Sequence, residues 1–234
     1  MMKKLKGIIF DKDGTLFDIQ RSWSEWAKVF VTKFSNQHNL DILKLAKAIN
    51  FDLASNKFVR ESIFVHGSVD DVVDAIFQNF PQVTKKKIHE GLFEGSSDAK
   101  QVPLTNLHKL FTNLETIILG LVTNDSETNG IKHLEQHDLT QYFDMIIGYD
   151  SGYGSKPEPG QLEAFLRKTN LLPQEVLMIG DSTYDLVAAN KINMPCLGVL
   201  SGTANKKDLS PHTPFIIDSI DELELWLKKT FLNS

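Results

Sequence analysis

Near its start the chain of 234 residues reads Lys6-Gly7-Ile8-Ile9-Phe10-Asp11-Lys12-Asp13-Gly14-Thr15-Leu16. The apolar run that ends at Phe10 predicts a short buried strand, and two acidic residues follow it closely. Because side chains alternate along an extended chain, the carboxylates of Asp11 and Asp13 should point to the same side. Open α/β sheets bind ligands at their carboxyl edge, so both acids are candidate catalytic residues. The competing explanation is an ordinary turn, in which Asp and Gly are favoured.

The second half of the chain alternates short apolar runs with amphipathic stretches. Strands that alternate with helices of about 10 residues predict βαβ units and a mostly parallel sheet. The predicted strands are 116–122, 143–147, 176–179, 196–200 and 215–217, and the predicted helices are 127–137, 159–168, 184–191 and 220–229. We therefore expect a doubly wound, Rossmann-like α/β core that the strand before Asp11 joins.

The segment between the first strand and this series has a different pattern. Trp23, Trp26, Phe30 and Phe34 recur at helical spacing, and little strand signal is present. We predict an inserted all-helical cap domain over residues 18–97, with the core formed by residues 1–17 and 98–234. The stretches 18–22 and 95–98 are the predicted hinges.

A second pair of acids, Asp181 and Asp185, follows the predicted strand 176–179. Acids at a strand end suit a hard cation that takes oxygen ligands, such as Mg²⁺. Helix capping is the competing explanation for the same residues, with Ser182 or Asp181 as the N-cap and Asp185 in the first turn.

Two further signals stand at predicted strand ends. Thr123 and Asn124 end one strand before a helix, where backbone and side-chain donors can bind an anion. Lys156 follows another strand after a Gly-rich loop and can neutralise a phosphate oxygen or a nucleophilic carboxylate. A single parallel sheet would bring all these groups to one edge. Together they supply a nucleophile, an acid–base, metal ligands and phosphate donors, which phosphoryl transfer requires.

The ordered motifs resemble those of the haloacid dehalogenase superfamily of phosphohydrolases. They read Asp11-Lys12-Asp13-Gly14-Thr15, Thr123-Asn124, Lys156-Pro157 and Gly180-Asp181-Ser182-Thr183-Tyr184-Asp185, and they occur in the order of that superfamily. The resemblance spans nearly the whole chain. The helical insert resembles the small α-helical cap of the superfamily, and the chain looks most like phosphoglycolate phosphatases.

The resemblance implies a role for each acid. Asp11 would form an aspartyl-phosphate, and Asp13 would protonate the leaving oxygen and then activate water. Mg²⁺ would be bound by the Asp11 carboxylate, the Asp13 backbone carbonyl and Asp181. Asp185 would support the water shell of the metal or Lys156.

The resemblance also implies which residues bind phosphate. Thr123, Asn124 and Lys156 would hold the transferring phosphoryl group, and Gly14 would donate its backbone N–H toward phosphate. The expected substrate is a small phosphorylated metabolite, with phosphoglycolate favoured.

Substrate specificity is expected from the cap, where Arg21 or Arg60 would meet a substrate carboxylate and Trp23 would line the pocket. Core packing is the competing explanation for an aromatic stripe at helical spacing. A hexose-phosphate mutase shares all four motifs and stays an alternative, as does a non-catalytic member of the superfamily that binds a partner. The second acid, Asp13, argues against a dehalogenase.

The composition limits the partners. The net charge is −5, so we expect no nucleic-acid partner. No apolar run approaches the roughly 20 residues of a membrane span, and the apolar stretch near the start is too short for a secretion signal. The one cysteine, Cys196, excludes an internal disulfide, as is usual in a reducing cytoplasm. We therefore expect a cytoplasmic monomer or weak homodimer that does not contact membranes.

Overall fold

The computed structural model describes residues 5–59, 62–202 and 204–231. Its elements, in chain order, are β1 (Gly7–Phe10), α1 (Ile19–His38), α2 (Ile42–Ala48), β2 (Phe51–Asp52), β3 (Lys57–Phe58), α3 (Ile63–His66), α4 (Val69–Asn79), α5 (Lys85–Phe93), η1 (Ser96–Asp98), α6 (Leu107–Thr112), β4 (Ile118–Val122), α7 (Glu127–Glu135), η2 (Thr140–Tyr142), β5 (Met145–Ile147), α8 (Gly160–Thr169), η3 (Pro173–Glu175), β6 (Val176–Gly180), α9 (Thr183–Lys191), β7 (Cys196–Val199), α10 (Lys206–Leu209), β8 (Ile216–Ile217), η4 (Ile220–Glu222) and α11 (Leu223–Phe231).

Six strands form one sheet in the order β5-β4-β1-β6-β7-β8, and every neighbouring pair is parallel. The first strand therefore lies in the middle of the sheet, between β4 and β6, although most of the sheet comes from the second half of the chain. This arrangement confirms the predicted α/β fold with a mostly parallel sheet.

Both faces of the sheet are covered, which explains why its strands are apolar without interruption. Successive residues of β1 point to opposite faces: Ile8 belongs to one apolar cluster and Ile9 to another. The Ile8 cluster takes in Phe111 of α6 and Leu223 of α11. The Ile9 cluster takes in Phe165 of α8, residues of α9, and the buried Cys196.

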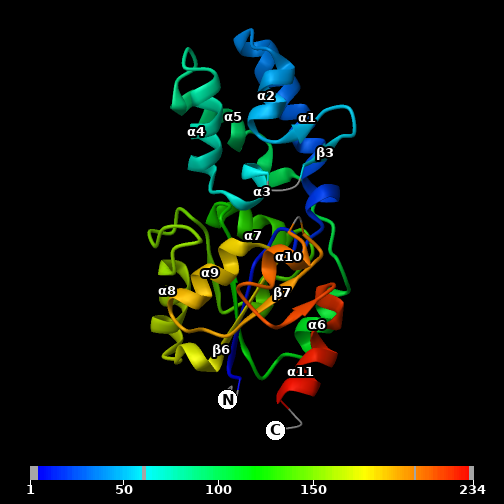
Figure 1. Cartoon of the computed structure of the whole chain (residues 1–234), viewed down its shortest axis with the longest axis vertical. Coiled ribbons are helices and arrows are strands. Elements are labelled where there is room, and N and C mark those ends of the chain that lie inside the picture. The colour runs from blue at the N-terminus through cyan, green and yellow to red at the C-terminus, as the bar shows by residue number, and fades with distance from the viewer. Residues whose placement is uncertain (1–4, 60–61, 203, 232–234) are drawn as a thin grey trace.

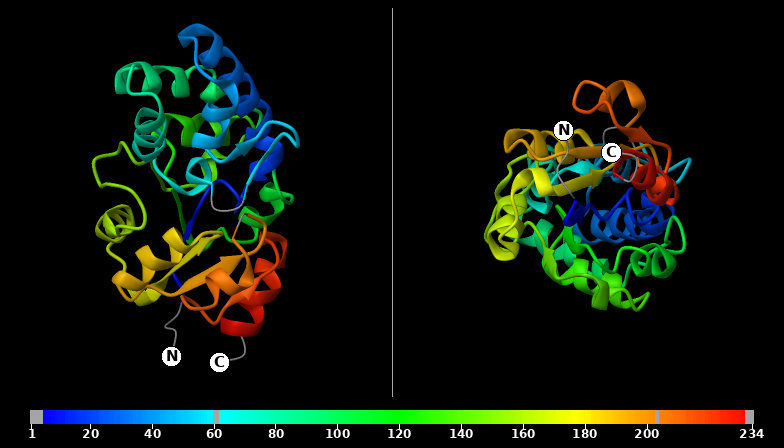
Figure 2. Two further views of the ribbon diagram at one scale, coloured as in Figure 1. Left: turned by 45° about the horizontal axis from the view of Figure 1, so that its top comes forward. Right: turned by 90° about the horizontal axis from the view of Figure 1, so that it is seen from below.

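The helices between β1 and α6 form a second body beyond the end of the sheet (Figure 1; Figure 2, left). Their aromatic and aliphatic side chains pack into a separate apolar cluster that includes the stripe of α1. The sequence marks their starts clearly. Asp18 caps α1 by accepting from the N–H of Arg21, Ser68 forms a capping box with Asp71 at α4, and Thr84 caps α5. The boundaries 18–97 given to this cap domain stay a prediction.

One detail of the cap differs from the all-helical prediction. β2 and β3 pair as a short antiparallel hairpin, with Phe51 opposite Phe58. Each strand has only two residues, so no alternation of polar and apolar side chains is long enough to reveal it. Asn50 and Asn56 adopt positive φ beside the strands, a conformation that Asn tolerates better than most residues.

The two chain segments that join the cap to the core lie side by side. The N–H of Asp18 donates to the carbonyl oxygen of Val102 at 2.8 Å, and the N–H of Val102 donates to Ser22 Oγ at 3.0 Å. Both predicted hinges contain helical residues. Asp18 caps α1, so residues 19–22 of the first hinge are helical, and the hinge at 95–98 contains the short helix η1. In the described part of the chain, no helix combines the length and apolar character needed to cross a membrane.

Candidate active site

The carboxyl ends of neighbouring strands bring the predicted site residues together. β1 pairs with both β4 and β6, so Asp11, Thr123 and Asp181, each of which follows one of these strands directly, line one cavity. Lys156 reaches the same cavity from the loop after β5. The remaining predicted core residues that line it are Asp13 and Asn124.

Lys156 is buried and lies between two carboxylates. Its Nζ atom is 2.7 Å from Asp11 Oδ1 and 2.6 Å from Asp185 Oδ1, and it also donates to the carbonyl oxygen of Val122 at 3.0 Å. These three acceptors match the three N–H bonds of an ammonium group. The two nearby charges more than offset the effect of burial, and they hold the pKa of Lys156 above its ordinary value. Lys156 is therefore a fixed cation in contact with the predicted nucleophile.

The carboxylate of Asp11 is buried, and burial disfavours its charged form. Burial raises its pKa to about 7, although the charge of Lys156 acts in the opposite direction. A second anion, Asp185, adds to the increase. An additional cation beside Asp11 would favour its charged, nucleophilic form.

Asp185 both caps a helix and binds Lys156. Its Oδ2 atom accepts from the N–H and the hydroxyl of Ser182 at 3.1 Å and 2.6 Å, which completes a capping box at the start of α9. Its Oδ1 atom holds Lys156. Helix capping thus fixes the carboxylate that orients the lysine.

Asp181 lies against two glycines that leave room for its carboxylate. A Cβ atom at Gly14 or at Gly202 would overlap the Asp181 side chain. Gly14 also has a φ of 88°, a conformation that glycine adopts without strain. The N–H of Gly14 donates to the carbonyl oxygen of Phe17 at 2.7 Å, which closes a tight turn. Gly14 thus allows the turn and the close approach of Asp181, and the contact of its N–H with phosphate stays a prediction.

The side chain of Asn124 binds the backbone of Lys156 in both directions. Its Nδ2 donates to the Lys156 carbonyl oxygen, and its Oδ1 accepts from the Lys156 N–H, each at 2.9 Å. This pair of bonds fixes the loop that carries the lysine. Thr123 is buried in the cavity lining, with its hydroxyl accepting from the N–H of Asp125 at 3.0 Å. Direct phosphate contacts of Thr123 and Asn124 stay predictions.

Asp13 is held at both carboxylate oxygens, by Lys12, which the sequence did not mark as a site residue, and by Trp23, which it marked only as a pocket residue. Lys12 Nζ lies 2.7 Å from Oδ2, and the indole Nε1–H of Trp23 donates to Oδ1 at 2.6 Å. Lys12 is fully buried and also contacts Asp125 at 3.0 Å and His133 Nδ1 at 2.9 Å.

One sequence signal could have revealed this group. Asp125, Asn129 and His133 recur every four residues: Asn129 and His133 share one face of α7, and Asp125 directly precedes the N-cap of this helix, Ser126. Burial lowers the pKa of His133 to about 4, and the adjacent charge of Lys12 contributes. The imidazole is therefore neutral at pH 7, with Nδ1 accepting from Lys12 and the Nε2–H donating to the carbonyl oxygen of Ser96 at 3.0 Å.

The cap supplies the opposite wall of the cavity, and this wall is largely apolar. It consists of Ile19, Trp23, Trp26, Phe64, Val69, Val72, Leu92 and Phe93, with Gly67, Ser68 and Ser96. Trp23 thus lines the pocket as predicted, whereas Arg21 is exposed on α1 and is absent from the described lining. Arg60 lies outside the described residues. Among the described lining residues, Lys156 is the only cationic side chain.

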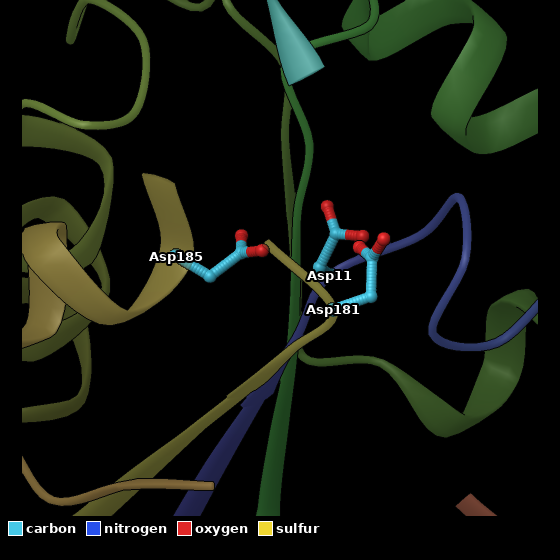
Figure 3. A group of neighbouring side chains, drawn as sticks. All are labelled: Asp11, Asp181 and Asp185. Carbon is cyan, nitrogen blue, oxygen red and sulfur yellow. The ribbon is translucent and has the colours of Figure 1, made fainter. Parts of the chain in front are cut away.

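Three buried carboxylates lie close enough together to hold a metal ion. Asp11, Asp181 and Asp185 each offer an oxygen within 4.8 Å of the others (Figure 3). Both oxygens of Asp185 already accept hydrogen bonds from Lys156 and Ser182, so this residue suits the support of Lys156 better than direct ligation. The remaining pair, Asp11 and Asp181, offers the hard oxygen donors that Mg²⁺ prefers.

This combination of a parallel sheet, a helical insert and convergent acids defines a hydrolase class. The family model of haloacid dehalogenase-like hydrolases matches residues 8–199. The chain belongs to this family.

Similar proteins extend over nearly the whole chain. The phosphoglycolate phosphatase of Vibrio vulnificus strain YJ016 is 28% identical over 229 residues, covering 94% of this chain and 95% of the relative. The phosphoglycolate phosphatase of Vibrio cholerae is 27% identical over 240 residues, covering 95% of this chain and 96% of the relative. A crystal structure of a predicted phosphoglycolate phosphatase from Haemophilus somnus 129PT superposes with a TM-score of 0.73 at 20% identity, covering 97% and 99% of the two chains. The last similarity supports the fold alone.

Proposed function

We propose that this chain is a phosphomonoester hydrolase in which Asp11 is the covalent nucleophile. The observation that carries the proposal is the position of Asp11 on the cavity floor, 2.7 Å from the ammonium of Lys156 and beside Asp181. Family membership independently supports a hydrolase. A phosphate dianion requires cationic partners, and Lys156 is a fixed one.

The reaction proceeds in two displacements at phosphorus. An oxygen of Asp11 bonds to phosphorus while the bond to the leaving oxygen breaks, and Asp13, which enters this step protonated, gives that oxygen its proton. Asp13 then takes a proton from water, which attacks the aspartyl-phosphate and releases inorganic phosphate. Lys156 holds the Asp11 carboxylate in place and offsets charge on the transferring group.

The proposed cofactor is Mg²⁺, held by the carboxylates of Asp11 and Asp181 with the backbone carbonyl of Asp13. When bound, it would supply positive charge that reduces repulsion between Asp11 and a phosphate dianion. The raised pKa of Asp11 agrees with this assignment, because the buried carboxylate has too little positive charge around it without a further cation.

Two substrate classes deserve direct comparison. Phosphoglycolate is the first, because full-length relatives bear the name phosphoglycolate phosphatase. Phosphomonoesters with an apolar leaving group are the second, because the described cap wall is aromatic and aliphatic and Lys156 is the only cation in the described lining. The proposed chemistry is the same for both classes.

The test is phosphate release from a panel that contains phosphoglycolate, phenyl phosphate and hexose phosphates, with and without Mg²⁺. The Asp11→Asn variant is the matched control, since it keeps the shape of the side chain and removes the nucleophile. We expect metal-dependent release that falls by at least about 10³-fold in this variant. The wild-type protein, quenched in acid during turnover, should also carry one phosphate on Asp11 by peptide mass spectrometry.

Full activity of Asp11→Asn would refute the aspartyl-phosphate mechanism. Conversion of a hexose 1-phosphate to its 6-phosphate, without release of phosphate, would identify a mutase instead. Absence of both reactions in folded protein would favour a non-catalytic binding role.

A further inference from the structure

Lys12 is a buried cation for which the two displacement steps provide no task. Its side chain is fully buried, and Nζ contacts Asp13 Oδ2 at 2.7 Å, Asp125 Oδ2 at 3.0 Å and His133 Nδ1 at 2.9 Å. An ammonium group has three N–H bonds, and three acceptors surround this one. Lys12 is therefore committed to neighbouring side chains and is not arranged to bind a substrate.

The partners of Lys12 are themselves held in place by α7. The other oxygen of Asp125 accepts from the N–H of Ser126 and from Asn129 Nδ2, both at 2.8 Å. His133 donates its remaining N–H to the backbone of Ser96 in η1, the segment that leads out of the cap. The lysine thus has a rigid support on the side opposite Asp13.

Asp13 is consequently fixed from two directions. Lys12 of the core holds Oδ2, and Trp23 of α1 donates its indole N–H to Oδ1. The Trp23 ring also lies 5.1 Å from Lys12 Nζ, and it contacts the His133 ring edge-to-face with a centroid separation of 5.4 Å. A carboxylate held at both oxygens loses its freedom to rotate, which is the requirement for accurate proton transfer.

We infer that Lys12 is a positioning residue that Asp125 and His133 hold in place so that it orients Asp13 for acid–base catalysis. This inference rests on the proposed function, because it assumes that Asp13 transfers the proton. It assigns a specific task to Lys12, the residue between the two acids of the first motif.

Leaving-group chemistry provides the test. An alkyl phosphate expels a strongly basic alkoxide and needs the proton of Asp13, whereas 4-nitrophenyl phosphate expels a stable phenolate and does not. General acid catalysis contributes about 10²- to 10⁴-fold. In Lys12→Met, we expect kcat/KM for alkyl phosphates to fall at least about 100-fold, and kcat/KM for 4-nitrophenyl phosphate to fall less than about 10-fold. An equal loss on both substrates, or no loss on either, would overturn the inference.

Three further variants separate this role from a structural one. Asp13→Asn gives the size of the full acid–base effect and should show the same selective loss. Lys12→Met/Asp125→Asn removes both buried charges, so it tests the inference even if Lys12→Met does not fold. Phe165→Leu, in the apolar cluster behind the sheet, should lower stability without changing the ratio of the two substrates.

These variants also distinguish the two possible failures. If Asp13→Asn is selective and neither Lys12 variant is, the inference fails and the proposed function stands. If Asp13→Asn shows no selectivity, the proton-transfer role of Asp13 fails and the inference fails with it.

Discussion

Replacing Asp11 with Asn should stabilise the metal-free protein at alkaline pH. The pKa of Asp11 is raised from its ordinary value of 3.8 to about 7, mainly by burial. A group with a raised pKa contributes stability that is fully present below the unfolded pKa and is lost as the pH rises through the folded one. The ionised carboxylate is therefore a cost to the fold at pH 8, and Asn carries no such charge.

The size of this cost follows from the shift. One pKa unit corresponds to about 1.36 kcal/mol, so a shift of roughly three units corresponds to about 4 kcal/mol. About 3 kcal/mol of this falls between pH 5 and pH 8, because Asp11 titrates mostly within that interval in the folded protein. Lys156 keeps its contact with Asp185 in the variant, so the substitution does not leave the lysine without an anion.

The assay is urea unfolding of wild-type protein and Asp11→Asn in EDTA, at pH 5 and at pH 8, with linear extrapolation to water. Comparing the variant with the wild type at each pH cancels the titration of groups that do not interact with Asp11. We expect the stability advantage of Asp11→Asn to grow by about 3 kcal/mol from pH 5 to pH 8. An advantage that does not change with pH, or a variant that is less stable at pH 8, would refute the account of Asp11 as a strained, buried anion.

Further predictions follow from contacts in the same site. Lys156→Met leaves Asp11 and Asp185 buried without their cation and should lower the free energy of unfolding by about 3–5 kcal/mol at pH 8; a loss below about 1 kcal/mol in urea unfolding would contradict it. Gly202→Ala places a methyl group against the Asp181 carboxylate and should raise the Mg²⁺ concentration for half-maximal activity at least about 10-fold, or about 1.4 kcal/mol; an unchanged requirement would show that Asp181 is not the ligand. Mg²⁺ at 100 times Kd should stabilise the wild-type protein by about 2.7 kcal/mol and so raise its Tm. Asp181→Asn should abolish most of this increase in Tm; equal increases in a thermal melt would place the ion elsewhere.

Much of the architecture could be predicted because buried strands appear in the sequence as short runs of apolar residues. β1 and β6 are buried along their whole length and β4 from its second residue onward, so all three read as unbroken apolar runs. Polar residues directly after such runs were correctly expected at one edge of the sheet. The short helices α6 and α10 were not predicted, since six and four residues are too few to establish a period.

The contacts around Asp13 could not be predicted in the same way. Lys12 and His133 are 121 positions apart, and the sequence does not reveal which distant acceptors surround a buried lysine. Lysine is rarely buried unless it is paired, so the default expectation places it in solvent. The second role of Gly14 was also not predictable, because the sequence does not show that its missing Cβ makes room for Asp181, a residue 167 positions away.

The hydrogen bonds between Asp18, Ser22 and Val102 have a consequence for evolution. They place the start and the end of the inserted helices next to each other, at one location on the core. Insertions are tolerated where the two junctions of the inserted segment are close together, because the host chain keeps its own path. Recombination at this pair of junctions would exchange the entire insert while leaving the sheet edge and its acids in register. The helices that form the apolar wall of the cavity can therefore be exchanged as a unit while the acids at the sheet edge keep their positions.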